Sequence, residues 1–215
     1  MASLGDRLRE VRARIDATGR SAERVTIVAV TKGFGSEACG SAVGAGLVDL
    51  GENYAQELEA KARALPGAAR WHMIGPVQRN KVRRLAPFVY LWQAVDRTEV
   101  GEAIAHHAPA ARVLVQVNIA ERAGRPGCSW EEAPPLVDEL TTLGLRVRGL
   151  MGVGDPDEPR PGFRRLAAEA ARLGLPVVSM GMSSDLEIAV EEGSTMVRVG
   201  TALLGPRPGR GDLRR

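Results

Sequence analysis

The stretch Val25–Lys32, VTIVAVTK, decides the fold that we expect for this chain. Most of its residues are β-branched, which is typical of a strand buried on both faces of a parallel sheet. It ends in Lys32, and Gly33-Phe34-Gly35 follows, where the backbone can turn freely. Burial lowers the pKa of a lysine and frees its amine as a nucleophile for Schiff-base chemistry. Taken alone, the segment fits at least as well an ordinary strand whose lysine marks the point where the chain meets water.

The same pattern of short apolar runs recurs seven more times along the chain. The runs begin near Leu47, Arg70, Val89, Arg112, Arg146, Pro176 and Thr195. Segments with the periodicity of an amphipathic helix separate them, over residues 36–45, 53–65, 78–85, 97–107, 130–143, 162–173 and 183–192. Strict alternation of strand and helix implies a parallel sheet with right-handed crossovers.

Eight such units favour a closed barrel over an open sheet. An open sheet that binds a dinucleotide would carry a glycine fingerprint after its first strand. Residues 32–35 do not supply this fingerprint, and Gly44-Ala45-Gly46 lies before a strand instead of after one. We therefore predict an α/β protein, a single-domain (β/α)8 TIM barrel that spans residues 21–205.

The two ends of the chain are expected to lie outside this barrel. Residues 1–20 contain Leu4, Leu8, Val11 and Ile15 at helical spacing, which predicts an additional N-terminal helix packed on the barrel. Residues 206–215, PRPGRGDLRR, have the composition of a disordered basic tail.

Composition argues against several classes of function. The 215 residues carry a net charge of only +3, and no basic run alternates with aromatic residues, so we expect no nucleic-acid partner. No apolar run is long enough to cross a membrane, and the charged N-terminal helix is unlike a signal peptide. Cys39 and Cys128 lack metal-ligand or redox spacing, so we expect no metal site and a reducing, cytoplasmic location.

In a barrel, active sites form at the carboxyl ends of the strands. Here these ends carry Lys32, residues 52–54, residues 72–75, Asp96-Arg97, Asn118, Met151, residues 180–183 and residues 198–201. His72 fits either a residue that orients a partner or a hydrogen-bonded histidine of the core. The loops over 121–129 and 152–162, rich in glycine and proline, are candidate lids over these ends.

The loops after the last two strands predict a site for an anion. Barrel enzymes often hold a phosphate on the loops that follow strands seven and eight. Those loops contain Gly181-Met182-Ser183-Ser184-Asp185 and Gly200-Thr201-Ala202. A pair of ordinary helix N-caps would have the same composition.

Arg198 interrupts the apolar residues of the last strand. Because alternate residues of a barrel strand face the interior, it shares the inner face with Met196 and Gly200. A buried arginine needs an anion or another acceptor. Either a ligand supplies that anion, or Glu52 or Asp49 does so within the protein.

A lysine, an arginine and a phosphate site at one end of a barrel fit pyridoxal 5'-phosphate. Lys32 would hold this cofactor as a Schiff base, and Arg198 would meet the ring nitrogen. Because an arginine stays protonated, it would donate to that nitrogen, which favours imine exchange over carbanion chemistry. Met180 and Met182 would pack around the plane of the cofactor.

With these residues assembled, the sequence resembles the pyridoxal phosphate homeostasis family (YggS/PROSC type). Members are single-domain barrels of fold type III that resemble the N-terminal domain of alanine racemase. The resemblance extends from about Val25 to Arg207 and rests on landmarks in order: AVTK (29–32), GENYAQE (51–57), WHMIGPVQRNK (71–81), VLVQVNIA (113–120), GLMGV (149–153), SMGMSSD (179–185) and GSTMVRVGTALLG (193–205). Gly33-Phe34-Gly35 and Arg125-Pro126-Gly127 depart from the pattern that the family often shows.

The resemblance implies roles for six residues. Lys32 holds the cofactor, Asn53 lies beside it, Arg198 meets the ring nitrogen, and the phosphate is bound by Ser183, Gly200 and Thr201. It also implies a protein that buffers or delivers pyridoxal phosphate within the cell, without robust catalytic turnover. The implied recipients are apoenzymes that depend on this cofactor.

Three other functions compete with this one. A racemase-like enzyme of the related fold needs an acid/base group from an additional C-terminal domain, and the chain ends at Arg215, too soon to encode it. We therefore expect racemase activity to be weak at most, and we expect a monomer because a second domain is missing. A Schiff-base aldolase or a sugar-phosphate isomerase would use no cofactor, and binding of nucleic acid ranks last.

Overall fold

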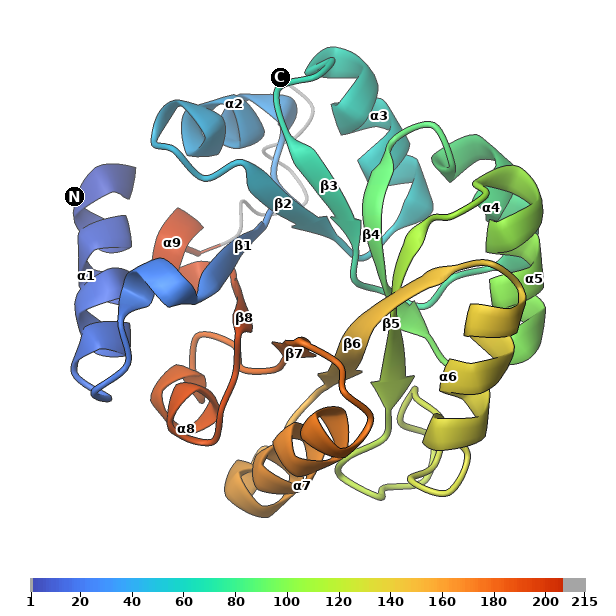
Figure 1. Cartoon of the computed structure of the whole chain (residues 1–215). Coiled ribbons are helices and arrows are strands. Elements are labelled where there is room, and N and C mark those ends of the chain that lie inside the picture. Colours follow the sequence, from blue (N-terminus) through green and yellow to red (C-terminus); the bar gives the residue numbers. More distant parts are fainter. Residues whose placement is uncertain (1, 207–215) are drawn as a thin grey trace.

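The computed structural model of the protein describes residues 2–206, in which eight parallel strands close into a barrel (Figure 1). Each strand pairs with the next in the sequence, and the last pairs with the first. The strands are β1 Thr26–Val30, β2 Asp49–Glu52, β3 Arg70–Met73, β4 Val89–Val95, β5 Arg112–Val117, β6 Arg146–Gly152, β7 Val177–Ser179 and β8 Met196–Val199. The predicted (β/α)8 barrel is confirmed, and each strand lies within a few residues of its predicted position.

Helices form a ring outside the strands (Figure 1). In the described part of the chain they are α1 Leu4–Asp16, α2 Ser36–Gly44, α3 Ala55–Ala64, α4 Arg79–Leu85, α5 Thr98–His107, α6 Ala133–Thr142, α7 Pro159–Arg172, α8 Leu186–Glu191 and α9 Thr201–Leu204, with a short 3-10 helix η1 Ala22–Arg24. The helix α7 begins before its predicted start at residue 162. Pro159 occupies its first turn, where a proline removes no intrahelical hydrogen bond.

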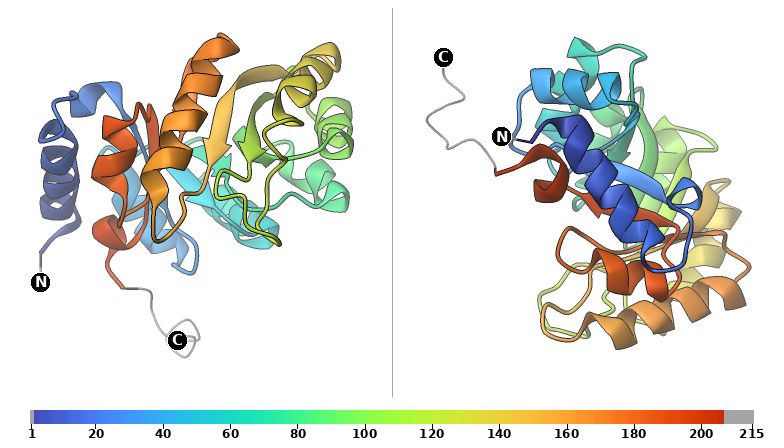
Figure 2. Two further views of the ribbon diagram at one scale, coloured as in Figure 1. Left: turned by 90° about the horizontal axis from the view of Figure 1, so that it is seen from below. Right: turned by 90° about the vertical axis from the view of Figure 1, so that its left-hand side faces the viewer.

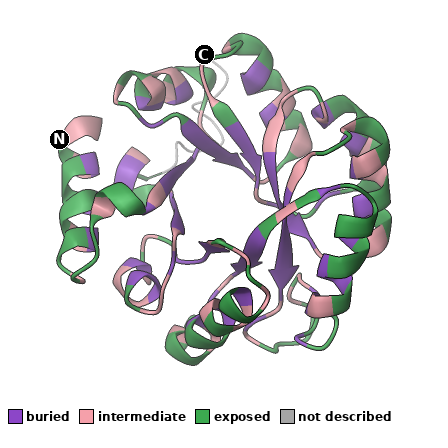
Figure 3. Cartoon of the chain, viewed as in Figure 1, coloured by how far each residue is buried: buried purple, intermediate pink, exposed green. Residues whose placement is uncertain are grey.

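The residues of the strands are mostly buried, and the ring of helices around them is largely exposed (Figure 3). Two apolar clusters form the core. The larger cluster, here called the outer layer, lies between strands and helices, and a smaller apolar cluster fills part of the barrel interior. Along β8, Met196 belongs to the interior cluster, whereas Val197 and Val199 belong to the outer layer. The predicted alternation is therefore confirmed, and it directs Arg198 inward.

The N-terminal helix α1 lies on the outside of the barrel next to α8 and α9 (Figure 2). A capping box between Ser3 and Asp6 starts it, and its buried residues are Leu8, Val11 and Ile15. Arg14 joins it to α8 through two hydrogen bonds to Glu187, of 2.6 and 2.8 Å.

Two further findings concern the C-terminal tail and the helices of the described residues. The predicted basic tail lies outside the described residues from residue 207 onward. In residues 2–206, no helix is long and apolar enough to cross a membrane.

Candidate functional site

The carboxyl ends of the strands surround a cavity of about 430 Å³. Six of the seven residues that the sequence predicts for a site line this cavity: Lys32, Asn53, Ser183, Arg198, Gly200 and Thr201. They follow or belong to β1, β2, β7 and β8, which are neighbours in the closed barrel. Because β8 pairs with β1, residues that follow the first and the last strand of the barrel meet at one cavity.

The structure does not bring the seventh residue, Met180, to the cavity. Ser179 faces the barrel interior, where its hydroxyl donates to Gln93, so the next residue along the chain faces outward. Met180 is accordingly buried between the strands and the helices. Gly181 has a φ of +93°, and the turn that it permits carries Met182 to the cavity instead. The prediction of Met180 as a site residue is therefore wrong.

Sequence reasoning missed Gln116, which lies on β5 and lines the cavity. Its side-chain amide donates to Pro126 O over 3.2 Å and so ties the β5–α6 loop to the strand. A polar residue within a run of buried apolar residues is a signal that could have found it.

Asn53 lies where two segments of backbone approach each other closely. Gly75 follows β3, and a Cβ atom at this position would lie 2.2 Å from Asn53 O. Glycine is required at such an approach because any other residue would clash with the backbone. Ile74 and Pro76 flank this glycine and also line the cavity, so the β3–α4 loop forms the wall next to Asn53.

A buried group of charges holds the backbone on the N-terminal side of Lys32. Lys61, on α3, is only 6% exposed, and its Nζ donates to Glu52 Oε1 over 2.7 Å and to Thr31 O over 2.9 Å. The Thr31 hydroxyl donates to the same oxygen of Glu52. Burial raises the pKa of Glu52, and the ammonium of Lys61 opposes this shift.

The same lysine holds the C-terminal side of Lys32 through Glu57. Lys61 Nζ donates to Glu57 Oε2 over 3.0 Å, and Gly33 N–H donates to that oxygen over 2.9 Å. Burial acts to raise the pKa of Glu57, but the hydrogen bond from Gly33 and the charge of Lys61 lower it overall. Lys61, Glu52 and Glu57, here named the Lys61 network, therefore fix both neighbours of Lys32. Sequence reasoning missed this network, for which the Glu57–Lys61 spacing on a helix was a weak signal.

Arg198 is held by neutral acceptors. Its Nη1 donates to Ser179 O and to Ser179 Oγ, each over 2.8 Å, and its Nη2 donates to Gly152 O over 2.8 Å. The side chain is buried, and burial lowers its pKa to about 10, so the guanidinium stays protonated at neutral pH. The alternative of a direct ion pair with Glu52 or Asp49 is wrong, because these carboxylates bind Lys61 and Arg70.

The loops after β7 and β8 contact each other. Ser183 Oγ accepts a hydrogen bond of 3.3 Å from Ala202 N–H, at the start of α9. Arg14 Nη2 donates to Ser183 O over 2.9 Å, which anchors the same loop to α1. Ser183 and Thr201, one from each loop, both line the cavity.

The two candidate lids also reach the cavity. Pro126 from the loop over 121–129 and Val153 from the loop over 152–162 line it. Arg122 joins the loops through ion pairs with Asp155 and Asp157, of 2.6 and 2.9 Å.

Other groups that could carry chemistry lie elsewhere or are buried. Residues 2–206 contain no group of three His, Cys, Asp or Glu side chains that could hold a metal ion. Cys39 and Cys128 are buried and free, and burial raises the pKa of the Cys128 thiol to about 12.

Fold and site together define a parallel barrel in which one amine and one fixed cation face a common cavity. The chain matches the model of the family described as alanine racemase, N-terminal domain, over residues 6–208, and it belongs to this family.

Similar proteins narrow the family further. The chain is 39% identical to the pyridoxal phosphate homeostasis protein of Pseudomonas aeruginosa, over 96% of this chain and 97% of that protein. It is 34% identical to the protein of the same name from Escherichia coli, over 96% and 98% of the two chains. The solved structure of PipY from Synechococcus elongatus with pyridoxal phosphate bound is 28% identical, with a TM-score of 0.82 over 94% of this chain and 100% of that chain. The family predicted from the sequence is confirmed.

Proposed function

We propose that this chain binds pyridoxal 5'-phosphate as a Schiff base on Lys32 and takes part in the homeostasis of this cofactor, by buffering or delivering it. In this proposal it does so without robust catalytic turnover. The observation that carries the proposal is the common cavity of Lys32, Arg198 and the loops after β7 and β8. The proteins that are named for this function and match almost the whole chain support it.

The donors around the cavity fit the groups of this cofactor. Lys32 supplies an amine for the aldehyde, and Asn53 lies on the same wall. Ser183, Gly200 and Thr201 lie where barrels commonly hold a phosphate. When bound, the cofactor supplies an electrophilic carbon and a ring that withdraws electrons.

Arg198 is proposed to limit how strongly that ring withdraws electrons. With a pKa of about 10, the guanidinium donates a hydrogen bond and retains its proton at neutral pH. A ring nitrogen that receives only a hydrogen bond stays unprotonated and stabilises negative charge weakly. The arrangement therefore favours holding and exchange of the cofactor over carbanion chemistry.

The test is the visible spectrum of the purified protein with pyridoxal phosphate, before and after borohydride. The chain contains only three lysines, Lys32, Lys61 and Lys81, so the labelled peptide identifies the amine directly. We expect Lys32→Ala to abolish the reducible band and Lys81→Ala, the control, to retain it. A Lys32→Ala protein with an equally reducible band would show that another amine holds the cofactor.

A racemase-like activity is the second candidate, because the matched family is described by alanine racemase. The protein loaded with cofactor is incubated with L-alanine or D-alanine. Sustained interconversion of the two enantiomers at an enzyme-like rate would argue against the carrier function and for a racemase.

We further propose that the chain acts as a cytoplasmic monomer and that apoenzymes dependent on pyridoxal phosphate receive the cofactor. Light scattering of the loaded protein tests the monomer. Transfer is tested by the activity that a cofactor-free recipient enzyme gains from the loaded protein, compared with an equal concentration of free pyridoxal phosphate. A gain that is neither faster nor larger than the gain from free pyridoxal phosphate would argue against delivery.

A further inference from the structure

A chain of hydrogen bonds runs through the barrel interior, away from Arg198. Arg198 Nη1 lies 2.8 Å from Ser179 Oγ, and that hydroxyl lies 2.7 Å from Gln93 Oε1. Gln93 Nε2 lies 2.7 Å from His72 Nδ1, and His72 Nε2 lies 2.9 Å from Asp49 Oδ1. All five side chains are buried. This series of hydrogen bonds joins residues of five strands, and it links the cavity to the first residue of β2, at the opposite end of the barrel.

The two ends of this series of hydrogen bonds determine which atom donates in each of them. An arginine only donates and a carboxylate only accepts. The hydroxyl of Ser179 therefore receives from Arg198 and donates to Gln93 Oε1, which leaves the amide nitrogen of Gln93 to donate to His72 Nδ1. His72 then carries its proton on Nε2 and donates it to Asp49. Each dipole points the same way, from the cation to the carboxylate.

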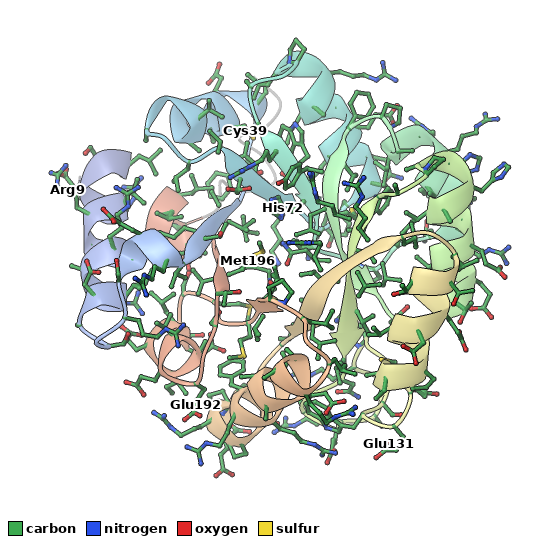
Figure 4. All side chains as sticks on the ribbon, viewed as in Figure 1. Arg9, Cys39, His72, Glu131, Glu192 and Met196 are labelled. Carbon is green, nitrogen blue, oxygen red and sulfur yellow. The ribbon has the colours of Figure 1, made fainter. Side chains whose placement is uncertain are left out.

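The rest of the barrel interior shows that the fold itself does not demand these polar residues. Apart from Gln116 at the cavity, the interior beside this route is apolar and contains Val28, Leu91, Leu114, Met151 and Met196. Figure 4 shows His72 and Met196 within the ring of strands, while Arg9, Glu131 and Glu192 lie outside it. Buried polar groups are costly unless they are paired, so a polar route through an otherwise apolar interior calls for a reason.

We infer that Ser179, Gln93 and His72 are positioning residues for Arg198, with Gln93 as the central one. Because the Ser179 hydroxyl donates its hydrogen bond to Gln93, the lone pairs of that oxygen are turned toward Arg198. The guanidinium is thereby held in one orientation at the cavity wall without a carboxylate that would neutralise it. The inference rests on the proposed function, since the orientation of Arg198 matters through a ligand in that cavity.

The first test uses the cofactor-free protein and does not depend on the proposed function. The chain has three histidines, and His106 and His107 lie on α5, away from the hydrogen-bond chain. In nitrogen NMR spectra we expect His72 as the Nε2–H tautomer, and we expect Arg198→Met to shift the His72 signals but not those of His106 and His107. A Nδ1–H tautomer, or His72 signals that do not move, would overturn the inference.

The second test measures the affinity for pyridoxal phosphate. Gln93→Leu removes the acceptor of the Ser179 hydroxyl, and we expect about tenfold weaker binding because Arg198 is then no longer held in one orientation. Leu91→Ala, on the inner face of the same strand, is the control for a damaged interior, and we expect its affinity to stay near that of the unchanged protein. Equal losses in both variants, or none in Gln93→Leu, would overturn the inference. If the unchanged protein binds no pyridoxal phosphate, the proposed function fails. The NMR result then still decides whether the hydrogen bonds couple Arg198 to His72.

Discussion

The two basic residues of the cavity, Lys32 and Arg198, are held in opposite ways. The neighbours of Lys32 are fixed by the Lys61 network, in which an ammonium and two carboxylates lie between β1, β2 and α3, outside the barrel interior. Arg198 is fixed from inside the barrel by backbone carbonyls and a hydroxyl. One anchor consists of ions and the other of neutral dipoles.

This difference agrees with the roles proposed for the two residues. Neutral acceptors orient Arg198 and leave its positive charge available to a ligand, whereas a carboxylate partner would cancel that charge. The Lys61 network acts on the backbone of Thr31 and Gly33. It can therefore use full charges, because its ammonium and carboxylates pair with one another inside the network.

The comparison predicts its largest effect for Lys61→Met. Removing the ammonium leaves the buried carboxylate of Glu52 without its cation, which costs about 3–5 kcal/mol of the free energy of unfolding. Urea unfolding measures this loss. Lys81→Met is the matched control. The double variant Glu52→Gln with Lys61→Met should recover much of the stability, because the fully buried carboxylate is gone and the half-buried Glu57 keeps its hydrogen bond from Gly33. A loss below about 1 kcal/mol in Lys61→Met would mean that the ionic anchor contributes no more than a surface pair.

A smaller loss of stability is expected for Arg198→Met. This change removes the hydrogen bonds that Arg198 donates to Ser179 O and Gly152 O but leaves no unpaired charge, so the expected cost is about 1–3 kcal/mol. The affinity for pyridoxal phosphate should fall by about tenfold or more, with a shifted absorption band. Urea unfolding and a cofactor titration measure the two effects. Unchanged affinity and spectrum would remove Arg198 from the site, and a stability loss as large as that of Lys61→Met would break the contrast between the anchors.

The smallest effect is expected for Asp49→Asn, at the far end of the interior chain. Burial acts to raise the pKa of Asp49, but hydrogen bonds from His72 and Arg70 lower it below the usual 3.8. The charged form is therefore favoured by folding, and it should stabilise the protein by roughly 1 kcal/mol above about pH 4.

The stabilisation that the Asp49 carboxylate provides depends on pH. As the pH falls through the native pKa of Asp49, the protonated acid comes to resemble asparagine, so the difference between the two proteins should close. Urea midpoints measured from about pH 6 down to about pH 3 check this. A difference that grows toward acid pH would show that the Asp49 carboxylate is not stabilised by its partners.

Much of the fold and of the cavity could be predicted from local patterns. Buried strands and amphipathic helices differ in their repeat, and strict alternation of the two permits few topologies. In a parallel barrel all carboxyl ends meet at one rim, so Lys32, Asn53 and Arg198 could be assigned to a common site before any contact was known. The period of two along β8 was enough to direct Arg198 inward.

The sequence by itself thus determined the order of the elements, the closed barrel and the strand ends that carry the site, because these depend on short-range periodicity. Only the tertiary structure decided what supports the site. The turn at Gly181 exchanged Met180 for Met182, and the partners of Lys61 and Gln93 come from other strands and helices. Such pairings depend on strand register and on barrel closure, which no local pattern records, because side chains distant in the chain become neighbours only when the whole sheet has closed.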